Sequence, residues 1–509
     1  MLTLRIMRSE RSALLGESMK TASRRTHHQL TFAVLTVGVG AYALLQSLVM
    51  PVLPTLESAL DTTQTDITWV LTAYLLSASI FTPVMGRLGD MHGKKRVFVI
   101  ALVALAAGSL LAALATSLPV MIAARVIQGI GGGVLPLAFG IIRDEFPEDK
   151  VAGAVGIIAA LTAVGAGLGI VLAGPIVTVL GFHWLFWIPL IMVVLAGLAA
   201  QILVPESRVR TAGKINWLTA LLLSGWLVAL LLGVSQAPTW GWASPIVIGL
   251  LVTAAVLAVT WVAVEARSAN PLIDMTMMRI RSVWAANLVA LLMGVGMYAA
   301  FGFLPQFLQT PSSVGFGFGA SVTESGLMLL PLSVGMFLLG LASGRLAARL
   351  GSKNLVIAGS IVSAIGYFVV AFLHETEMDI YLATSLTGIG FGLAFSAMSN
   401  VVVAAVPSEQ TGVASGMNAN IRTIGGSLGA ACMASVVTAG ASTSGVPQES
   451  GYTNGFVMLG VAVALGAVAA LFIPAMQRDD TTNLEPSPEL RHPELALVAG
   501  GTLVGDESE

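Results

Sequence analysis

Long apolar stretches separated by short polar segments run through most of the chain. Residues 97–117 and 246–264 contain no charged side chain, and each supplies the roughly 20 apolar residues that a helix needs to cross a bilayer. A membrane-spanning β-barrel would instead show short segments of alternating polarity. Hydropathy, turn residues and charges together predict fourteen helical spans, at residues 31–53, 68–88, 97–115, 119–142, 153–176, 184–203, 215–233, 245–264, 284–308, 325–347, 355–373, 380–403, 413–439 and 454–474.

The basic residues predict how these spans are oriented. If the N-terminus is cytoplasmic, the N-terminal arm, the C-terminal tail and the loops after even-numbered spans carry 23 of the 25 Lys and Arg residues. The other two, Arg125 and Arg422, lie inside predicted spans. The positive-inside rule therefore predicts a multi-pass protein of the cell inner (plasma) membrane with both termini cytoplasmic. We expect the basic N-terminal arm to be retained, because the apolar run after it is too long for a signal peptide and lacks a small-residue cleavage site.

The composition excludes several classes of function. Only 10% of the residues are charged and 56% are hydrophobic, whereas soluble domains carry about 25% charged residues, so we expect the surface to face a lipid bilayer. A net charge of -2 leaves no basic surface for a nucleic-acid partner. The single cysteine, Cys432, and six scattered His residues predict no metal site. No nucleotide-binding loop, channel filter or catalytic constellation is present, so we expect no cofactor, no ATP drive and no enzymatic activity.

The chain repeats itself with a period near 260 residues. The segment GRLGDMHG at 86–93 returns as GRLAARLG at 344–351, and FPEDK at 146 has the counterpart VPSEQ at 406. Two sets of glycines recur in the same order, namely Gly129, Gly131 and Gly133 as Gly388, Gly390 and Gly392, and Gly165 and Gly169 as Gly425 and Gly429. Two parallel halves related in this way are typical of a transporter architecture with the substrate path between them.

Six helices in each half leave the seventh and eighth spans without a counterpart, and we interpret these two as an inserted hairpin. The predicted fold is an all-α polytopic membrane protein with two pseudo-symmetric six-helix bundles and an inserted two-helix hairpin. The predicted segments are a cytoplasmic N-terminal arm (1–30), an N-terminal six-helix bundle (31–205), the inserted helices with their linkers (206–282), a C-terminal six-helix bundle (283–475) and a disordered cytoplasmic tail (476–509).

Four features stand out from this apolar background. GRLGDMHGKKR, at 86–96, follows the second span; its glycines permit a tight turn, and we expect Asp90 near the start of the third helix, where a carboxylate favours the helix dipole. Arg125 opens RVIQGIGGG in the fourth span; a mid-span Arg costs roughly 2.5 kcal/mol or more and is usually functional, although it could also snorkel to the interface. The fifth span contains several glycines spaced along the helix, followed by a proline. The second half carries FLPQFLQ at 303–309, ESG at 324–326 and GMNANIR at 416–422.

These segments resemble the major facilitator superfamily, and more narrowly its 14-helix branch of drug:proton antiporters, over roughly residues 31–475. The resemblance implies a secondary transporter. It also implies that the 86–96 segment is a conformational latch, which holds the two halves together on the cytoplasmic side. The latch residues are Gly86, Asp90, Gly93, Lys94 and Arg96. Ala348 replaces the carboxylate in the second copy, so only the first copy is expected to work as a charged latch.

The resemblance assigns roles to the fourth and fifth spans as well. It implies that Arg125 takes part in coupling protons to transport. It further implies that the motif of the fifth span is typical of exporters. The residues of this motif are Gly156, Gly165, Gly169, Gly174 and Pro175. The match there is imperfect, because Ile170 stands where a proline is usual and Ala173 replaces a glycine. These glycines also suit close helix packing.

A central cavity between the halves is the expected substrate site, with apolar and aromatic walls and a few polar groups. Its candidate lining residues are Gln46, Tyr74, Gln128, Tyr298, Phe301, Gln306, Asn418 and Arg422. Hydrogen bonding between helices is an equally good interpretation of the asparagine in this set.

The position of the proton-carrying acid is not evident from the sequence. Many relatives of this branch carry an Asp in the first span, but this chain reads QSLVMPVLP at 46–54, and none of its 27 acidic residues lies at the centre of a predicted span. Embedded carboxylates usually carry the proton in antiporters. Glu324 and Asp66, both at the outer start of a helix, are the candidates, and each could equally be a solvated helix cap. Without a central carboxylate, a neutral or anionic substrate is favoured over a dicationic one.

The sequence therefore predicts a monomeric, proton-coupled exporter of small amphipathic drug-like compounds that works by alternating access. The alternative on the same fold is a dedicated exporter of one endogenous metabolite or self-made antibiotic, and only a substrate profile separates the two.

Overall fold

The structure is a computed structural model that describes residues 28–62, 64–67, 69–207, 216–268, 271–407, 410–439 and 447–474. These residues form helices and their connections, with no strand among them. Residues 1–27 of the predicted arm and the whole of the predicted tail lie outside the described residues.

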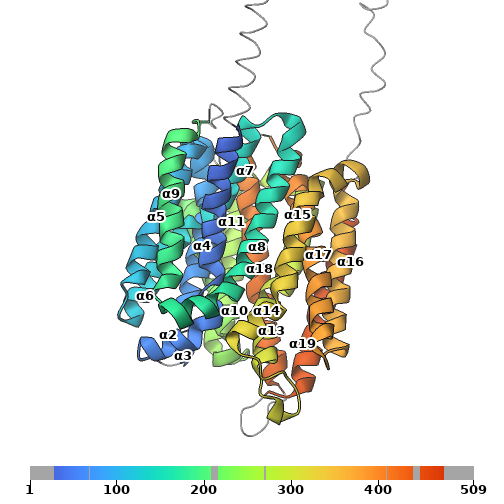
Figure 1. Cartoon of the computed structure of the whole chain (residues 1–509). Coiled ribbons are helices and arrows are strands. Elements are labelled where there is room, and N and C mark those ends of the chain that lie inside the picture. Colours follow the sequence, from blue (N-terminus) through green and yellow to red (C-terminus); the bar gives the residue numbers. More distant parts are fainter. Residues whose placement is uncertain are drawn as a thin grey trace, which may run out of the picture. The chain divides into compact units, whose positions relative to one another are not determined.

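Thirteen helical segments in the described ranges are long and apolar enough to cross a membrane. Helix α8 (Glu148–Leu180), with 33 residues, is also long enough and contains the apolar stretch Gly167–Leu180. The described helices thus account for the fourteen predicted spans and confirm the all-α polytopic fold (Figure 1).

The spans follow one another along the chain with short connections. They are residues 28–47, which lead into η1 (Met50–Val52), then α4 (Trp69–His92), α5 (Lys94–Ala113), α6 (Leu118–Gly129) continued by η2 (Ile130–Gly133) and α7 (Val134–Glu145), α8, α9 (Trp184–Leu203), α10 (Trp217–Trp240), α11 (Pro245–Glu265), α13 (Arg281–Gln309), α14 (Val322–Met328) continued by α15 (Leu330–Leu350), α16 (Ser352–Phe372), α17 (Glu377–Ala405), α18 (Thr411–Thr438) and α19 (Glu449–Ala470). Short helices α2 (Leu53–Ala59), α3 (Gln64–Ile67), α12 (Met275–Arg279) and η3 (Ser312–Val314) lie in the connections.

The turns that join the spans use glycine where the backbone needs a positive φ. Gly93, between α4 and α5, has φ 108°, and its repeat counterpart Gly351, between α15 and α16, has φ 81°. Only glycine adopts such angles without strain. We call the end of the bundle with these two turns the basic end, and the other end, with Glu57, Asp61 and the α16–α17 connection, the acidic end.

One sequence expectation about local structure is wrong. Asp90 was expected near the start of the third helix, but it lies in the last turn of α4, because that helix continues to His92 and α5 begins directly after Gly93. A carboxylate at a helix C-terminus gains nothing from the helix dipole. Its stabilisation must therefore come from other groups.

Buried hydrophobic side chains form two clusters. One is built from residues between Val34 and Val204, with Val403 added. The other is built from residues between Ala220 and Ile473, with Ile170 added. The hydrophobic interiors of the two sequence halves are therefore largely separate.

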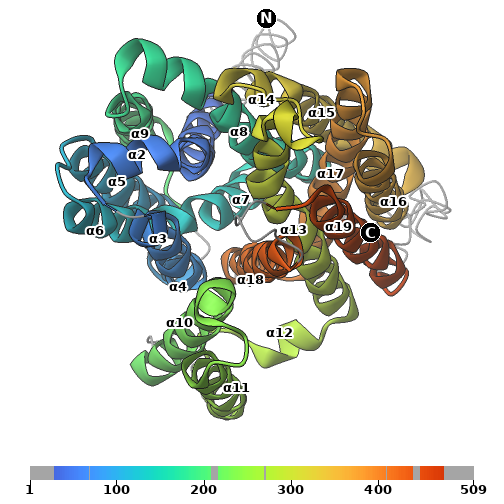
Figure 2. The same ribbon diagram turned by 90° about the horizontal axis from the view of Figure 1, so that it is seen from below.

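The hairpin of α10 and α11 lies at the side of the bundle, where α10 contacts both α4 and α18 (Figure 2). Trp242, in the hairpin turn, donates from Nε1 to Ser435 Oγ of α18 at 2.7 Å. At the opposite end, Gln410, just before α18, donates to Asp274 Oδ2 at 3.3 Å. Burial raises the pKa of Asp274, but hydrogen bonds from Thr276 and Gln410 outweigh it and hold that pKa below its ordinary value. The hairpin turn and the segment that follows α11 are thus attached to opposite ends of α18.

Glycines bring α13 and α18 into close contact. Gly294 faces the Arg422 carbonyl, and Gly425 and Gly429 face the carbonyls of Leu291 and Val295. A methyl group at any of these positions would overlap the facing backbone. Small residues of this kind let helix backbones approach closely in membranes, and here they set the distance between two helices that line the interior.

We expect Gly425→Ala to lower the stability of the protein by about 1–3 kcal/mol, as overpacking of a tight contact usually does. A Cβ at this position would lie 2.9 Å from the Leu291 carbonyl carbon. Gly249→Ala in α11 is the matched control, because a Cβ there meets nothing within 4 Å. Thermal unfolding in detergent should show a lower midpoint for the first variant alone, and equal midpoints would contradict the packing described.

Candidate functional site

A central cavity lies between side chains from both halves of the sequence. Its wall is drawn from residues 28–47, α4, α6, α8, α13, α17 and α18. The lining residues are Gln46, Ser47, Met50, Leu71, Tyr74, Leu75, Arg125, Ala159, Thr162, Ile170, Met297, Tyr298, Phe301, Phe395 and Arg422. The wall is mainly apolar and aromatic, with two guanidinium groups and no carboxylate among these residues.

Arg125 is fully buried and held by neutral groups. It donates from Nε to the Val70 carbonyl at 3.1 Å, and from one terminal nitrogen to the Leu45 carbonyl at 3.3 Å and to Gln128 Oε1 at 2.8 Å. Its guanidinium carbon lies 4.3 Å from the centre of the Tyr74 ring, within the range of a cation–π contact. The Arg125 side chain is therefore buried among neutral groups and does not extend to the interface.

Gln128 stands behind Arg125 rather than on the cavity wall. Its amide nitrogen donates to Ser109 Oγ at 3.1 Å, and its side chain is fully buried. Gln128 thus fixes Arg125 from the side away from the cavity, which differs from its expected place in the lining.

The glycine run after Gln128 explains how the Arg125 segment fits into the bundle. A Cβ at Gly129 or Gly132 would overlap Ser77 or Thr82 of α4, and one at Gly131 would overlap Leu105 of α5. These contacts coincide with the 3-10 turn η2 inside the span. Arg125 is therefore placed on a helix that is in close contact with neighbours on two sides.

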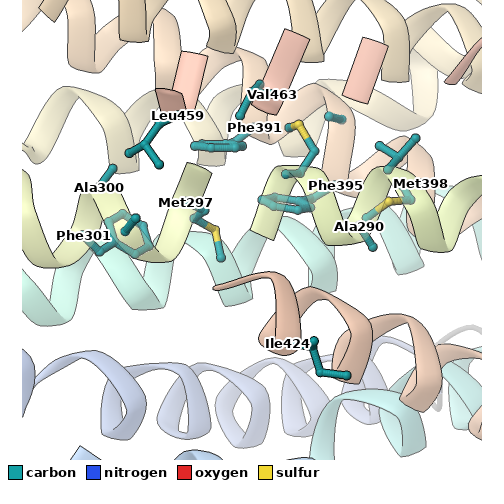
Figure 3. Close-up of a cluster of buried hydrophobic side chains, with 14 of the residues drawn as sticks. Ala290, Met297, Ala300, Phe301, Phe391, Phe395, Met398, Ile424, Leu459 and Val463 are labelled. Carbon is teal, nitrogen blue, oxygen red and sulfur yellow. The ribbon is translucent and has the colours of Figure 1, made fainter. Parts of the chain in front are cut away.

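Two other contacts join side chains of the cavity wall, one a hydrogen bond and the other a cation–π contact. Gln46 of the first helix donates to the Tyr298 hydroxyl of α13 at 3.1 Å. The guanidinium carbon of Arg422 lies 5.1 Å from the centre of the Phe395 ring. Figure 3 shows Phe395 one turn from Phe391 on α17, with Met297 and Phe301 on a neighbouring helix.

Smaller cavities continue from the central one toward both ends. Arg422 lines the central cavity and two others, one with Tyr42 and Thr82 and one with Phe139 and Asn418. Asn418 also donates to Asn287 Oδ1 at 2.9 Å, so it both lines a cavity and joins two helices. Toward the acidic end, a further cavity is lined by Phe301 and Gln306 together with Glu57. Gln306 is thus separated from the central cavity, with Phe301 common to both.

Helix α8 forms much of the contact between the halves. Gly165 and Gly169 face Ala43 and Ser47 of the first helix. Gly156 faces the hydroxyls of Ser343 and Ser396, and Gly174 faces Thr323, all from the second half. Pro175 lies exposed within α8. The predicted glycines of the fifth span are therefore divided between the two halves, with Gly165 and Gly169 against the first and Gly156 and Gly174 against the second.

The segment predicted as a latch is divided by the structure. Asp90 accepts a hydrogen bond from the Val413 amide of α18 at 3.3 Å, and a Cβ at Gly86 would lie 2.6 Å from the Gly412 carbonyl oxygen. Lys94 is fully buried, with Nζ 2.8 Å from Asp144 and 3.8 Å from Asp90. These residues join α4, α5, α7 and α18.

Gly93 and Arg96 lie outside this contact with the second half. Gly93 forms the turn between α4 and α5. Arg96 has a side chain that is 69% exposed and pairs with Glu206, near the end of α9, at 3.5 Å. The predicted set of five thus contains an inter-half contact and a surface ion pair.

The two acidic candidates lie at the acidic end, away from the central cavity. Glu324 is exposed, and its carboxylate accepts from the Ser321 amide at 2.8 Å in a capping box at the start of α14. Asp66 is exposed in the first turn of α3. Neither side chain lines the central cavity.

Sequence reasoning missed three polar residues at the basic end. Asp144 pairs with Lys94, and Arg143 donates to the Val403 carbonyl and, at 3.0 Å, to Thr411 Oγ1. From the sequence, Arg143 was assigned only as one of the basic loop residues that predict the orientation. The one available signal was its place in the repeat, about three turns after the triple glycine and close to the FPEDK segment.

Comparison with known proteins identifies the family. Residues 35–430 match the Major Facilitator Superfamily. The chain belongs to this superfamily. Members are transporters rather than enzymes, so the protein is a multi-pass membrane transporter of small molecules.

Several curated superfamily members resemble the chain over most of its length. The multidrug transporter protein MdtP of Bacillus subtilis is 30% identical, with 73% of this chain and 68% of that protein covered. The multidrug resistance protein Stp of Mycobacterium tuberculosis is 30% identical over 82% of this chain and 77% of that protein. The tetracenomycin C resistance and export protein of Streptomyces glaucescens is 28% identical, with 79% and 74% covered.

A solved structure shares the superfamily fold. The human organic anion transporter MFSD10 (TETRAN) superposes with a TM-score of 0.63, covering 87% of this chain and 99% of that one, at 17% identity. This likeness supports the all-helical architecture described above.

We expect Lys94→Met to destabilise the protein by about 3–5 kcal/mol, because it leaves Asp90 and Asp144 buried beside each other without their cation. Lys95→Met is the control; Lys95 donates to the Gln201 carbonyl at an exposed contact and its loss should have little effect. Unfolding midpoints in detergent measure both. Similar midpoints for the two variants would show that the buried cluster does not stabilise the basic end.

Proposed function

We propose that the protein is a proton-coupled antiporter that exports small amphipathic drug-like compounds across the cell inner membrane, with both termini cytoplasmic. The central cavity carries this proposal, because apolar and aromatic walls with few polar groups suit such compounds and both halves contribute to the wall. The names of the bacterial relatives, two of them multidrug proteins, support drug-like substrates.

Transport in this proposal occurs by alternating access, with the segments 31–205 and 283–475 moving as two bundles of one monomer. The separate hydrophobic clusters support this division. The contacts of Gly86 and Asp90 with α18 then close the basic end, which is cytoplasmic in the proposed orientation. The inserted helices, within 206–282, stay attached to α18 during the movement.

The proposed coupling involves Arg125, with Glu324 and Asp66 as the candidate acids. Arg125 supports this role by its position, because it joins the first helix, α4 and α6 beside the cavity. A proton taken up at an acid of the acidic end would then enter from outside. Glu324→Gln tests the first acid, since full pH-dependent transport in that variant would remove it as a candidate.

A dedicated exporter of one endogenous metabolite or self-made antibiotic is the second candidate function. It is favoured by the relative named for resistance to and export of a single compound, tetracenomycin C. The cavity suits either function, and a broad substrate profile favours the first.

We expect proteoliposomes with an imposed pH gradient to transport several unrelated amphipathic dyes, and transport to stop when an ionophore collapses the gradient. The expected direction is opposite to proton flow. Protein-free liposomes and a heat-inactivated sample are the controls. Transport that is indifferent to the collapsed gradient would disprove antiport, and transport of a single compound would favour the dedicated exporter.

We expect a disulfide across the α8 contact to stop transport reversibly. In a Cys432→Ser background, Gly156→Cys is combined with Ser343→Cys, because a Cβ at Gly156 lies 2.8 Å from the Ser343 hydroxyl and a disulfide places its atoms at similar distances. Gly174→Cys with Thr323→Cys makes the equivalent pair near the acidic end, because a Cβ at Gly174 would lie 2.8 Å from the Thr323 hydroxyl.

Oxidation should abolish transport by either pair and a reductant should restore it, while the single-cysteine variants should not respond. Fully cross-linked protein that still transports would contradict movement between the halves at this contact.

A further inference from the structure

Arg422 differs from Lys94 and Arg125, the two fully buried cations among the described residues, in having no protein partner for its charge. Lys94 lies between two carboxylates, and three hydrogen bonds hold Arg125. The Arg422 side chain has no hydrogen bond or ion pair with any of the residues that the structure describes, and its buried Nε is unpartnered. Its guanidinium carbon lies over the Phe395 ring, 5.1 Å from the ring centre. A half-buried guanidinium in this state is costly unless another group supplies hydrogen bonds and charge.

The position of Arg422 makes its donors available to a bound molecule. The side chain lines the central cavity and both of the smaller cavities toward the basic end. Close packing of α13 and α18, with Gly294 against the Arg422 carbonyl, fixes the backbone from which it extends. Any compound that moves from the central cavity toward the basic end therefore passes this guanidinium.

The electrostatics of the wall favour one sign of ligand charge. Arg125 and Arg422 are both in the lining, and none of the residues that line these three cavities is acidic. In a weakly polar interior such charges act over longer distances than in water. A cationic ligand would be repelled, whereas an acidic group could accept from the planar fork of Arg422 in a paired geometry.

The surroundings of Arg422 suit a flat hydrophobic skeleton. Phe395 stacks on Phe391 with ring centres 5.4 Å apart, and Tyr298 and Phe301 add aromatic surface to the same wall. Figure 3 shows Met297 near Phe395, with Phe301 further along the same helix as Met297. Gln46 and Tyr298 bond to each other, so the free charged donors of the wall are those of Arg422 and the unpartnered second terminal nitrogen of Arg125.

From this geometry we infer that Arg422 determines substrate specificity, and that the transported compounds are aromatic monoanions whose acidic group binds to it. The inference rests on the proposed function and narrows its substrate class. Arg125 contributes to the positive potential from its fixed position, and Phe395 supports both the guanidinium and the aromatic skeleton.

The test uses three compounds with one skeleton: 2-naphthalenesulfonate, 2-naphthalenesulfonamide and 2-naphthyltrimethylammonium. The first and last keep their charge at all accessible pH values, so the pH gradient does not move them through lipid. Binding to purified protein is measured by equilibrium dialysis, and transport is measured in proteoliposomes. We expect the sulfonate to bind at least about tenfold more tightly than the sulfonamide, as a charge-assisted hydrogen bond provides, and the trimethylammonium compound to bind most weakly.

Arg422→Gln should reduce the preference for sulfonate over sulfonamide to about one, and Arg422→Lys should retain part of it because the charge remains. Arg279→Gln, at an exposed position in α12, is the control and should keep the wild-type ratio. If Arg422→Gln does not fold, the order in which the wild-type protein binds the three compounds, together with the Arg422→Lys result, still tests the inference. Equal binding of the three compounds, or tightest binding of the trimethylammonium compound, would overturn the inference.

These outcomes are separable from failure of the proposed function. If the sulfonamide is exported under a pH gradient while no preference for the sulfonate exists, antiport stands and the substrate class is wrong. If the preference holds in binding but the gradient drives no transport, the recognition role of Arg422 stands and proton coupling is wrong.

Discussion

The cost of placing charge in a weakly polar interior determines how this transporter is arranged. Lys94 and Arg125 have protein groups around them, whereas Arg422 remains available to a ligand. At the basic end, Lys94 lies between Asp90 and Asp144, and the same carboxylate of Asp90 accepts from α18. Near the cavity, backbone carbonyls of Leu45 and Val70 surround Arg125. Each satisfied charge thereby ties together three or more helices.

Close contact between the halves depends on small residues rather than on interlocking hydrophobic side chains. The two hydrophobic clusters are nearly separate in sequence, while glycines of α8 and of α4 meet serines, threonines and backbone of the second half. Such contacts bury little apolar area, and hydrophobic stabilisation is roughly proportional to that area. A contact of this type costs less to open than a hydrophobic core, which suits the proposed movement of the two halves.

The fold could be predicted from the sequence in almost every respect, because apolar runs, the basic loops and the repeat are all local or periodic signals. Residues of the cavity wall were predictable where mid-span polarity is itself the signal, as for Gln46, Arg125 and Arg422. Gln128 has the same signal but faces away from the cavity, and hydropathy does not determine on which side of a helix a side chain lies. Asp144 was missed because a charge at a helix end looks the same in sequence whether it is solvated or buried against Lys94.

A cavity with positive charges and no lining carboxylate has a consequence for coupling. Where a carboxylate lines the substrate site, proton and substrate can compete directly for the same group. Arginine does not release its proton under physiological conditions, so in the proposed antiporter the proton must bind elsewhere. The link between proton and substrate would then depend on the relative stability of the two conformations, which each ligand shifts only by its difference in affinity for them. In the proposed cycle, the contact of Asp90 with α18 would break between these conformations, so it would matter as much to coupling as the cavity itself.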